Sequence, residues 1–341
     1  MIEQPLVSIC IPTYNAALTV RETLLSILAQ TYSNIVVHVS DNASTDETLD
    51  IVESLNDPRI RIHRQQMNLG GEGNFNKCIQ LAEGKYTAIF HADDLYEPQM
   101  VEQQVAFLES HTQAGAVFTE AALIDESGKN IGAIRFPDNL GSYEQVYDFE
   151  KIFKAVLEHS NFLVCPSVMA RTKVYQEDIK QWRGEQFKSS ADLDVWLRIA
   201  SKHPVGLLPK ALMKYRISDH QFSARVRLQT DRPDFFLVIE HYLTQAPVSA
   251  MLDKADFEHF NRLDRRDRVM RAVNLFLDFR SDEARSLVDD IFSWDAIKAG
   301  LQTKRGLGVL IAGVYIRSLL LLRLESVGRI TLGYLKRVMR K

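Results

Sequence analysis

The chain has 341 residues, of which 46% are apolar and 25% charged, a composition typical of a soluble globular protein with a hydrophobic core. Its net charge of −3 is unevenly distributed, since residues 1–150 hold 8 basic and 22 acidic side chains and residues 298–341 hold 10 basic and one acidic. The acidic front half argues against nucleic acid as a partner, because phosphate backbones bind basic surfaces, and it suits a site for a divalent cation.

The front of the chain alternates apolar runs with segments of helical periodicity. Strands are predicted at 6–14, 35–42, 59–65 and 85–91, and helices at 19–30, 44–55, 74–83 and 98–111. This alternation predicts parallel βαβ units, and hence an α/β fold with a Rossmann-like, mostly parallel sheet and flanking helices. Ser44 and Glu47 have the spacing of a capping box for the second helix.

Later segments depart from this rhythm. A strand over 115–125 is expected to enter a hairpin at the turn 126–129. Helices are predicted at 148–160 and 191–203, and a strand at 204–216. From about residue 232 the sequence is mostly helical and rich in charge pairs.

Polar side chains gather where the predicted strands end. In parallel sheets, ligands bind beyond the carboxyl ends of the strands. Two adjacent carboxylates such as Asp93 and Asp94 repel each other unless they share a cation or a proton. Carboxylates and substrate phosphates together hold Mg²⁺ or Mn²⁺, so this pair predicts a cation site. The alternative is a solvated turn that caps the following helix.

Four other features each allow a functional and a structural interpretation. Asp41 is either a turn residue or an acceptor for a nucleobase N–H. The glycine-rich stretch 68–76 is a loop over a nucleotide or a plain turn, and it matches no Lys-containing phosphate loop. Asp192 is either a favourable acid at a helix N-terminus or a general base. Arg216 and His220 are structural or lie near a diphosphate.

Six segments in order across roughly residues 5–225 together resemble family 2 of the inverting glycosyltransferases, which have the GT-A fold. These segments are PTYN (12–15), DNASTDET (41–48), NLG with NFNKCI (68–79), ADDLYEP (92–98), DLDVWLRIA (192–200) and YRISDHQFS (215–223). The resemblance implies an enzyme with a nucleotide-diphosphate sugar donor, most often UDP-linked, and a Mn²⁺ or Mg²⁺ cofactor.

The resemblance also implies roles for individual residues. The base and ribose are expected to contact Pro12, Thr13, Tyr14, Asn15, Asp41, Asn68, Gly70, Asn76 and Asp93. Asp94, with His220, is expected to hold the metal, and Arg216 and His220 are expected to lie on the diphosphate. Asp192 matches the base that deprotonates the acceptor hydroxyl, so that attack opposite the leaving group inverts the sugar.

Two positions depart from the family pattern. His91 stands two residues before Asp93, where many members have an acid, and this change is expected to affect the metal or the choice of sugar. Ala191 stands where many members have Glu before the base, which removes a neighbour that would raise the pKa of Asp192.

The sequence predicts three regions. Residues 1–225 are expected to form the GT-A domain, with a nucleotide-binding half to about 125 and an acceptor half after it. Residues 226–300 would be a helical extension. Residues 301–341 are expected to form one basic amphipathic helix on the anionic inner face of the cell membrane, beside a glycan or lipid-linked acceptor. The alternative is a helix packed on the catalytic domain or in a homo-oligomer. No signal peptide is seen, so the cytoplasm is the expected compartment.

Two other classes of function compete with this interpretation. A nucleotidyltransferase would normally carry a basic, glycine-rich triphosphate loop after the first strand, and residues 12–20 hold none. A non-catalytic sugar-nucleotide-binding homologue would be expected to lose Asp94 or Asp192, and both are present.

Overall fold

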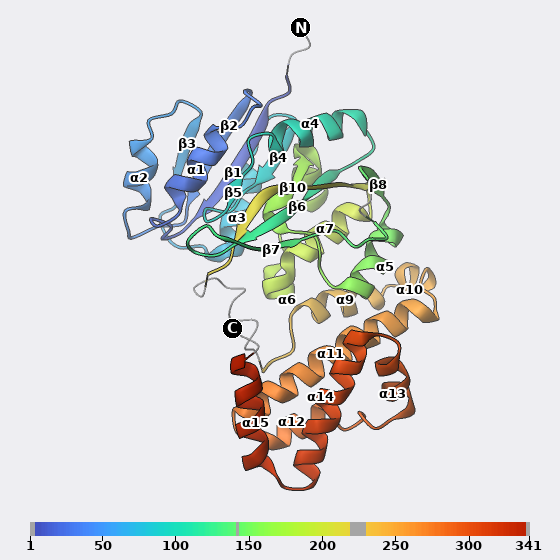
Figure 1. The fold of residues 1–341 in the computed structure, drawn as a ribbon. Helices are drawn as coiled ribbons and strands as arrows, with labels where there is room; N and C mark the ends of the chain where they lie inside the picture. Colours follow the sequence, from blue (N-terminus) through green and yellow to red (C-terminus); the bar gives the residue numbers. More distant parts are fainter. Residues whose placement is uncertain (1–3, 141–142, 219–229, 339–341) are drawn as a thin grey trace. The chain divides into compact units, whose positions relative to one another are not determined.

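The computed structural model describes residues 4–140, 143–218 and 230–338, with side chains described up to residue 333. The chain divides into two compact units, Met1–Ser218 (unit 1) and Asp219–Lys341 (unit 2). Unit 1 combines a sheet with helices, and the described part of unit 2 is helical (Figure 1). His220 lies outside the described residues, so its predicted roles are not placed.

Unit 1 is built on one mixed sheet. Among the described residues its strands follow the order β3-β2-β1-β4-β9-β6-β10-β5, with β7 beside β6 and β8 beside β10. The bounds are β1 (Val7–Thr13), β2 (Ile35–Asp41), β3 (Ile60–Arg64), β4 (Tyr86–Ile89), β5 (Leu95–Tyr96), β6 (Ala116–Ile124), β7 (Asn130–Ile134), β8 (Gln145–Tyr147), β9 (Met169–Arg171) and β10 (Val205–Arg216). The strands β3, β2, β1 and β4 are parallel, as the alternation predicted.

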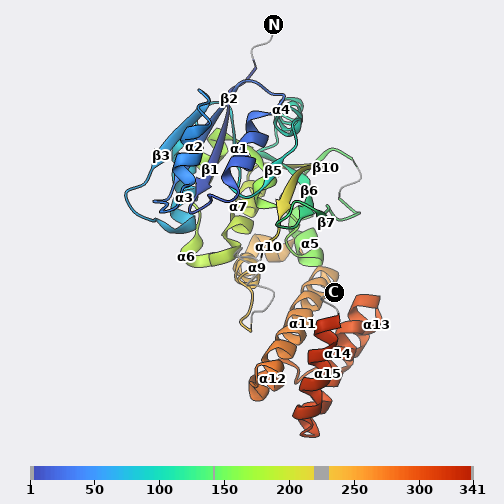
Figure 2. The same cartoon turned by 60° about the vertical axis from the view of Figure 1, so that its left-hand side comes forward.

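Helices flank this sheet (Figure 2). They are α1 (Val20–Leu28), α2 (Thr48–Ser54), α3 (Gly70–Leu81), α4 (Met100–Ser110), α5 (Phe149–His159), α6 (Gly184–Phe187) and α7 (Ala191–Ala200). Helix α3 packs on β1 and β2, α4 packs on β6 and β10, and α5 packs against α7. Every residue of β2 is buried, which is typical of a parallel strand covered on both faces.

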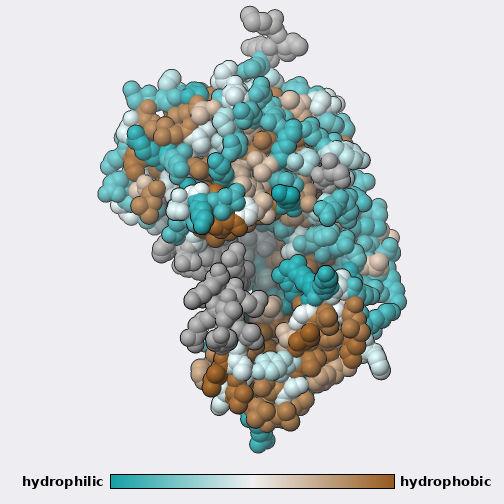
Figure 3. Space-filling model, viewed as in Figure 1, coloured by the Kyte–Doolittle hydropathy of each residue, from teal (hydrophilic) through white to brown (hydrophobic). Residues whose placement is uncertain are grey.

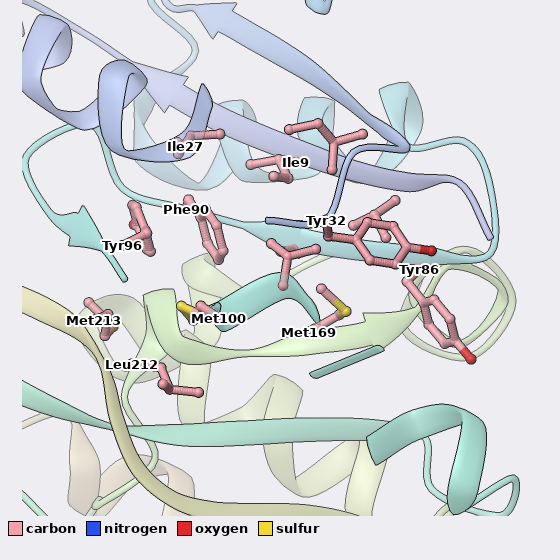
Figure 4. Packing of buried hydrophobic residues seen from close by; sticks show 14 of the residues in the cluster. Ile9, Ile27, Tyr32, Tyr86, Phe90, Tyr96, Met100, Met169, Leu212 and Met213 are labelled. Atoms are coloured by element: carbon pink, nitrogen blue, oxygen red, sulfur yellow. The ribbon is translucent and has the colours of Figure 1, made fainter. Parts of the chain in front are cut away.

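The core of unit 1 reaches directly to the end of β4. Phe90 stacks on Tyr96 with 3.8 Å between ring centroids, and both rings are buried (Figure 4). The Tyr96 hydroxyl accepts a hydrogen bond from the backbone N–H of His91 at 2.7 Å. Packing therefore fixes the backbone just before the Asp93-Asp94 pair.

Two predicted helix starts in unit 1 are wrong. Helix α3 begins at Gly70 rather than Asn74, so the glycine-rich stretch is largely helical. Gly73 is required there, because a Cβ at this position would lie 2.6 Å from the Cβ of Leu69. Helix α2 begins at Thr48, and the predicted capping box does not form, because the Ser44 hydroxyl instead accepts from the backbone N–H of Asn15 at 2.9 Å.

Unit 2 has its own helices and its own core. They are α9 (Phe235–Leu243), α10 (Ala246–Ala250), α11 (Lys254–Leu277), α12 (Ser281–Leu287), α13 (Trp294–Leu301), α14 (Lys304–Leu321) and α15 (Glu325–Val338). The predicted single helix over 301–341 is wrong, since α14 and α15 are separated by a break at Arg323, which has φ of 55°. Burial of Ile316 and Leu320 of α14 with Phe276 of α11 supplies the reason for this hairpin-like packing.

Candidate functional site

The ends of β1 and β2 hold the predicted nucleotide residues Thr13 and Asp41 side by side. The two residues are partners in the strand register, and the Thr13 hydroxyl donates to Asp41 Oδ1 at 3.5 Å. Asp41 Oδ2 accepts the backbone N–H of Ser44 at 3.1 Å, and the side chain is only 1% exposed. Pro12, one residue before the strand end, pairs in register with Ser40. A buried carboxylate with these two donors has a fixed orientation.

The loop after β1 is fastened to the loop after β2. Asn15 has φ of 49°, a conformation that Asn adopts more readily than most residues. Its side-chain oxygen accepts the backbone N–H of Thr45 at 2.9 Å, and Asp46 accepts the N–H of Ala17 at 3.1 Å. Tyr14 is left 49% exposed at the strand end. Its ring is therefore open to a bound molecule at the strand end.

Asn74 of α3 joins the same two strand ends, and sequence reasoning did not single it out. Its amide nitrogen donates to the carbonyls of Ser40 at 2.9 Å and Thr13 at 3.3 Å, and its oxygen accepts from the Ser40 hydroxyl at 2.7 Å. The segment NFN (74–76) contained a signal for this role of Asn74. A polar residue on the side of a helix that faces the sheet is buried and needs hydrogen-bond partners.

The predicted residues Asn68, Gly70 and Asn76 serve internal contacts in this structure. The Asn42 side chain donates to Asn68 Oδ1 at 2.9 Å and to the Gly70 carbonyl at 3.1 Å, which ties the start of α3 to the end of β2. Asn76 Oδ1 accepts the backbone N–H of Trp182 at 2.8 Å. Their proposed contact with a nucleotide stays a prediction.

His91, Asp93 and Asp94 form a cluster beyond β4. One ligand atom from each lies within 4.8 Å of the others, and His91 Nδ1 is 3.8 Å from Asp94 Oδ2. Asp94 is fully buried, and its Oδ2 has no hydrogen-bond partner among the described residues. Burial, followed by the negative charge of Asp93, raises the pKa of the Asp94 carboxyl well above its ordinary value. A buried carboxylate with an unpartnered oxygen beside a second carboxylate is a site that a divalent cation would stabilise.

Arg216, at the end of β10, bonds both aspartates of this cluster. Its backbone N–H donates to the Asp94 carboxylate (Oδ1) at 2.8 Å, and its side-chain Nε donates to the Asp93 carbonyl at 2.9 Å. A further guanidinium nitrogen pairs with Glu22 of α1 at 2.7 Å, and another donates to the Glu126 carbonyl at 3.2 Å. With 6% of its surface exposed, Arg216 holds the segment that carries Asp93 and Asp94 in place. Its contact with a diphosphate stays a prediction.

Asp192 lies in the first turn of α7. Burial raises the pKa of the Asp192 carboxyl from 3.8 to about 6, although two backbone N–H groups, of Leu193 and of Asp192 itself, favour the charged form. The pKa of the Cys165 thiol is raised by burial first, then by the negative charges of Asp192 and Asp94. The candidate base and the candidate metal ligand therefore both lie near Cys165, although they are 98 residues apart in sequence.

The neighbouring acid Asp194 has a different role. It is fully buried and pairs with Arg198 at 3.0 Å and with Arg183, whose Nε donates to it at 2.9 Å. Helix α7 packs into the interior of unit 1, since Trp196 is 1% exposed. These contacts fix the helix that carries Asp192.

Comparison with known proteins decides the family. A model of glycosyl transferase family 2 matches residues 8–180, about half of the chain. The chain belongs to this family. The glycosyltransferase is 29% identical over 233 residues to an uncharacterized glycosyltransferase of Methanocaldococcus jannaschii, an alignment that covers 67% of this chain and 76% of that protein. It is 30% identical over 233 residues to an uncharacterized glycosyltransferase of Haemophilus influenzae, covering 64% of this chain and 68% of that protein.

Solved structures give the fold. The Staphylococcus aureus TarS 1–349 structure in complex with UDP-GlcNAc superposes with a TM-score of 0.61 at 16% identity, covering 92% of this glycosyltransferase and 91% of that chain. The complex of TarS 1–349 with UDP gives a TM-score of 0.59 at 17% identity, covering 92% of this chain and 90% of that chain. The predicted GT-A fold is thereby confirmed, and the enzyme class is glycosyl transfer.

Proposed function

We propose that this glycosyltransferase is an inverting, metal-dependent enzyme that moves a sugar from a UDP-sugar to a hydroxyl of a glycan or lipid-linked acceptor in surface polysaccharide biosynthesis. The observation that carries the proposal is the cluster beyond β4, in which the buried and unpartnered Oδ2 of Asp94 lies close to Asp93 and His91. Such a cluster suits a cation for the leaving diphosphate, and an inverting mechanism requires the base for the acceptor on the opposite side of the sugar.

The ligand atoms of the cluster beyond β4 suit a divalent cation. The unpartnered oxygen of Asp94, the Asp93 carboxylate and a His91 nitrogen combine oxygen with imidazole ligands, which Mn²⁺ accepts and Mg²⁺ accepts less readily. When bound, a divalent cation supplies Lewis-acid stabilisation of the negative charge on the departing diphosphate. Arg216 would keep the two carboxylates oriented through its bonds to Asp94 and to the Asp93 carbonyl.

Asp192 suits the role of general base. A carboxyl with a pKa of about 6 is ionised at neutral pH, yet is basic enough to receive a proton as the acceptor hydroxyl attacks. Proton removal on the side opposite the leaving group gives inversion and needs no covalent intermediate. Burial, and not a neighbouring acid, supplies the raised pKa, so the absence of Glu at position 191 does not disable the base.

Uridine suits the nucleotide end. The fixed Asp41 carboxylate would accept a nucleobase N–H, and the exposed ring of Tyr14 would contact the base or ribose. The TarS chains of similar fold bind UDP and UDP-GlcNAc, which supports a uridine donor for this family member as well. A cytoplasmic location at the inner face of the membrane follows if the acceptor is lipid-linked.

Calorimetric titration of UDP into the purified full chain, with and without Mn²⁺, tests the proposal. We expect Mn²⁺ to strengthen UDP binding and Asp94→Asn to remove most of that gain. NMR of the product then reports the anomeric configuration, which inversion predicts to be opposite to that of the donor. UDP binding without any turnover over a panel of UDP-sugars and acceptors would favour the non-catalytic homologue. No UDP binding under either condition would overturn the donor assignment, and with it the role of Asp41.

A further inference from the structure

Unit 2 exposes an unusual amount of apolar surface. The sequence of α14 is hydrophobic on almost every side, and such a helix is normally buried all round. One face of α14 does pack into the core of unit 2 through Gly313, Ile316 and Leu320. The opposite face carries Leu307 and Ile311, one turn apart, and Ile311 is 60% exposed. Figure 3 shows hydrophobic residues gathered over this helical unit. We therefore expect a binding partner to cover this exposed apolar face of α14.

Aromatic and basic side chains adjoin it on α13. Trp294 is 84% exposed, and Lys298 and Leu301 follow at i+4 and i+7, so the three residues share one face of the helix. Lys304 and Arg305 then open α14, which packs on α13. We define the basic–aromatic face as these residues with Leu307: Trp294, Lys298, Leu301, Lys304, Arg305 and Leu307.

The charge of this face is not neutralised nearby. Lys298, Lys304 and Arg305 are exposed and have no ion pair among the described residues. The pKa of the Arg266 guanidinium is lowered by burial and then by the positive charge of Arg305, which shows that two cations lie close together. Asp295, beside Trp294, is also exposed, so three positive charges face one negative charge here.

We propose that the basic–aromatic face binds the surface of an anionic lipid bilayer. Lysine and arginine attract anionic headgroups, tryptophan partitions to the headgroup level, and the apolar side chains would enter the acyl boundary. No helix in the described part of the chain is long and apolar enough to cross a membrane, so contact is made from one side. A second copy of the chain is the less favoured occupant, because self-pairing would bring this positive face against its like. The inference shares the membrane location with the proposed function, but lipid binding does not depend on transferase activity.

Sedimentation of the full chain with vesicles provides the test. One set of vesicles contains phosphatidylserine and the other phosphatidylcholine alone. We expect binding to the anionic vesicles only, weakening as salt rises, because surface charges are screened within about 8 Å at 0.15 M ionic strength. Lys304→Gln with Arg305→Gln should weaken binding about 30-fold, since each basic residue near an anionic surface contributes about 1 kcal/mol. Trp294→Ala should weaken binding at both low and high salt.

The controls separate this surface from other causes. Tyr143→Ala removes an exposed aromatic ring from unit 1 and should leave vesicle binding unchanged. All variants change exposed side chains, so circular dichroism and UDP binding should match the parent chain. Equal binding to both kinds of vesicle, or none, would overturn the proposal. So would a change in oligomeric state on Trp294→Ala without any vesicle binding, since that result assigns the face to a second copy.

Discussion

Replacing Asp192 with Asn should remove activity and at the same time stabilise the protein. The amide keeps nearly the same shape and can still accept the N–H of Leu193, which bonds Asp192 Oδ1 at 2.7 Å. It cannot take a proton, so we expect transfer to fall by about 10²–10⁴, the usual contribution of general-base catalysis. In the parent enzyme kcat/KM should decline as the pH falls through about 6, where Asp192 becomes protonated. The residual kcat/KM of Asp192→Asn should not fall over this pH range.

The stability effect follows from the same pKa. Raising a carboxyl pKa from 3.8 to about 6 corresponds to about 3 kcal/mol of folding free energy, which we halve because the side chain is partly exposed. A raised pKa means that the folded state binds the proton more tightly than the unfolded state. The cost is therefore absent below about pH 4, grows as pH rises to 6, and is constant above it. At pH 7.5 the free energy of unfolding of Asp192→Asn should exceed that of the parent by about 1.5 kcal/mol. For a domain the size of unit 1 this corresponds to a Tm higher by about 3–6 °C.

Asp194→Asn is the matched control on the same helix. This carboxylate is fully buried between Arg183 and Arg198, so its loss should destabilise the protein by about 2–4 kcal/mol. Differential scanning fluorimetry at pH 4 and 7.5, with a single-turnover transfer assay, measures both effects. The reasoning is refuted if Asp192→Asn keeps full turnover. It is also refuted if the Tm difference from the parent is the same at both pH values.

Three further predictions concern the strand ends. Arg216→Ala should raise the Mn²⁺ concentration needed for half-maximal UDP binding more than it weakens metal-free UDP binding. It removes the guanidinium bonds to the Asp93 carbonyl and Glu22, although the backbone N–H bond to Asp94 remains; titration would show equal losses if Arg216 instead binds the diphosphate. Asn74→Ala should lower the free energy of unfolding by about 1–3 kcal/mol in urea, since it leaves buried groups on β1 and β2 unpaired, and an unchanged midpoint would contradict this. Chelation by EDTA should abolish transfer until Mn²⁺ is restored, and turnover that persists in EDTA would rule out a metal-dependent mechanism.

The sequence by itself determined the α/β order of unit 1 and much of the candidate site. Hydrophobic periodicity is a local property, so strands such as Val7–Thr13 and Ile35–Asp41 are visible without tertiary information. Parallel strands end at one edge of a sheet, and this rule alone was enough to group Thr13 with Asp41.

Only the tertiary structure decided which distant groups meet. Arg216 bonds Asp94 across 122 residues, and Asp192 and Asp94 both lie near Cys165. The start of α3 and the two-helix C-terminus were also mispredicted locally. Glycines normally disfavour helices and apolar runs favour continuous ones. The bond from the Asn42 side chain to the Gly70 carbonyl and the packing of α14 on α11 are the tertiary contacts that a local pattern does not contain. Local periodicity specifies which face of an element is buried, but the pairing of polar groups depends on loops and crossovers that no local pattern encodes.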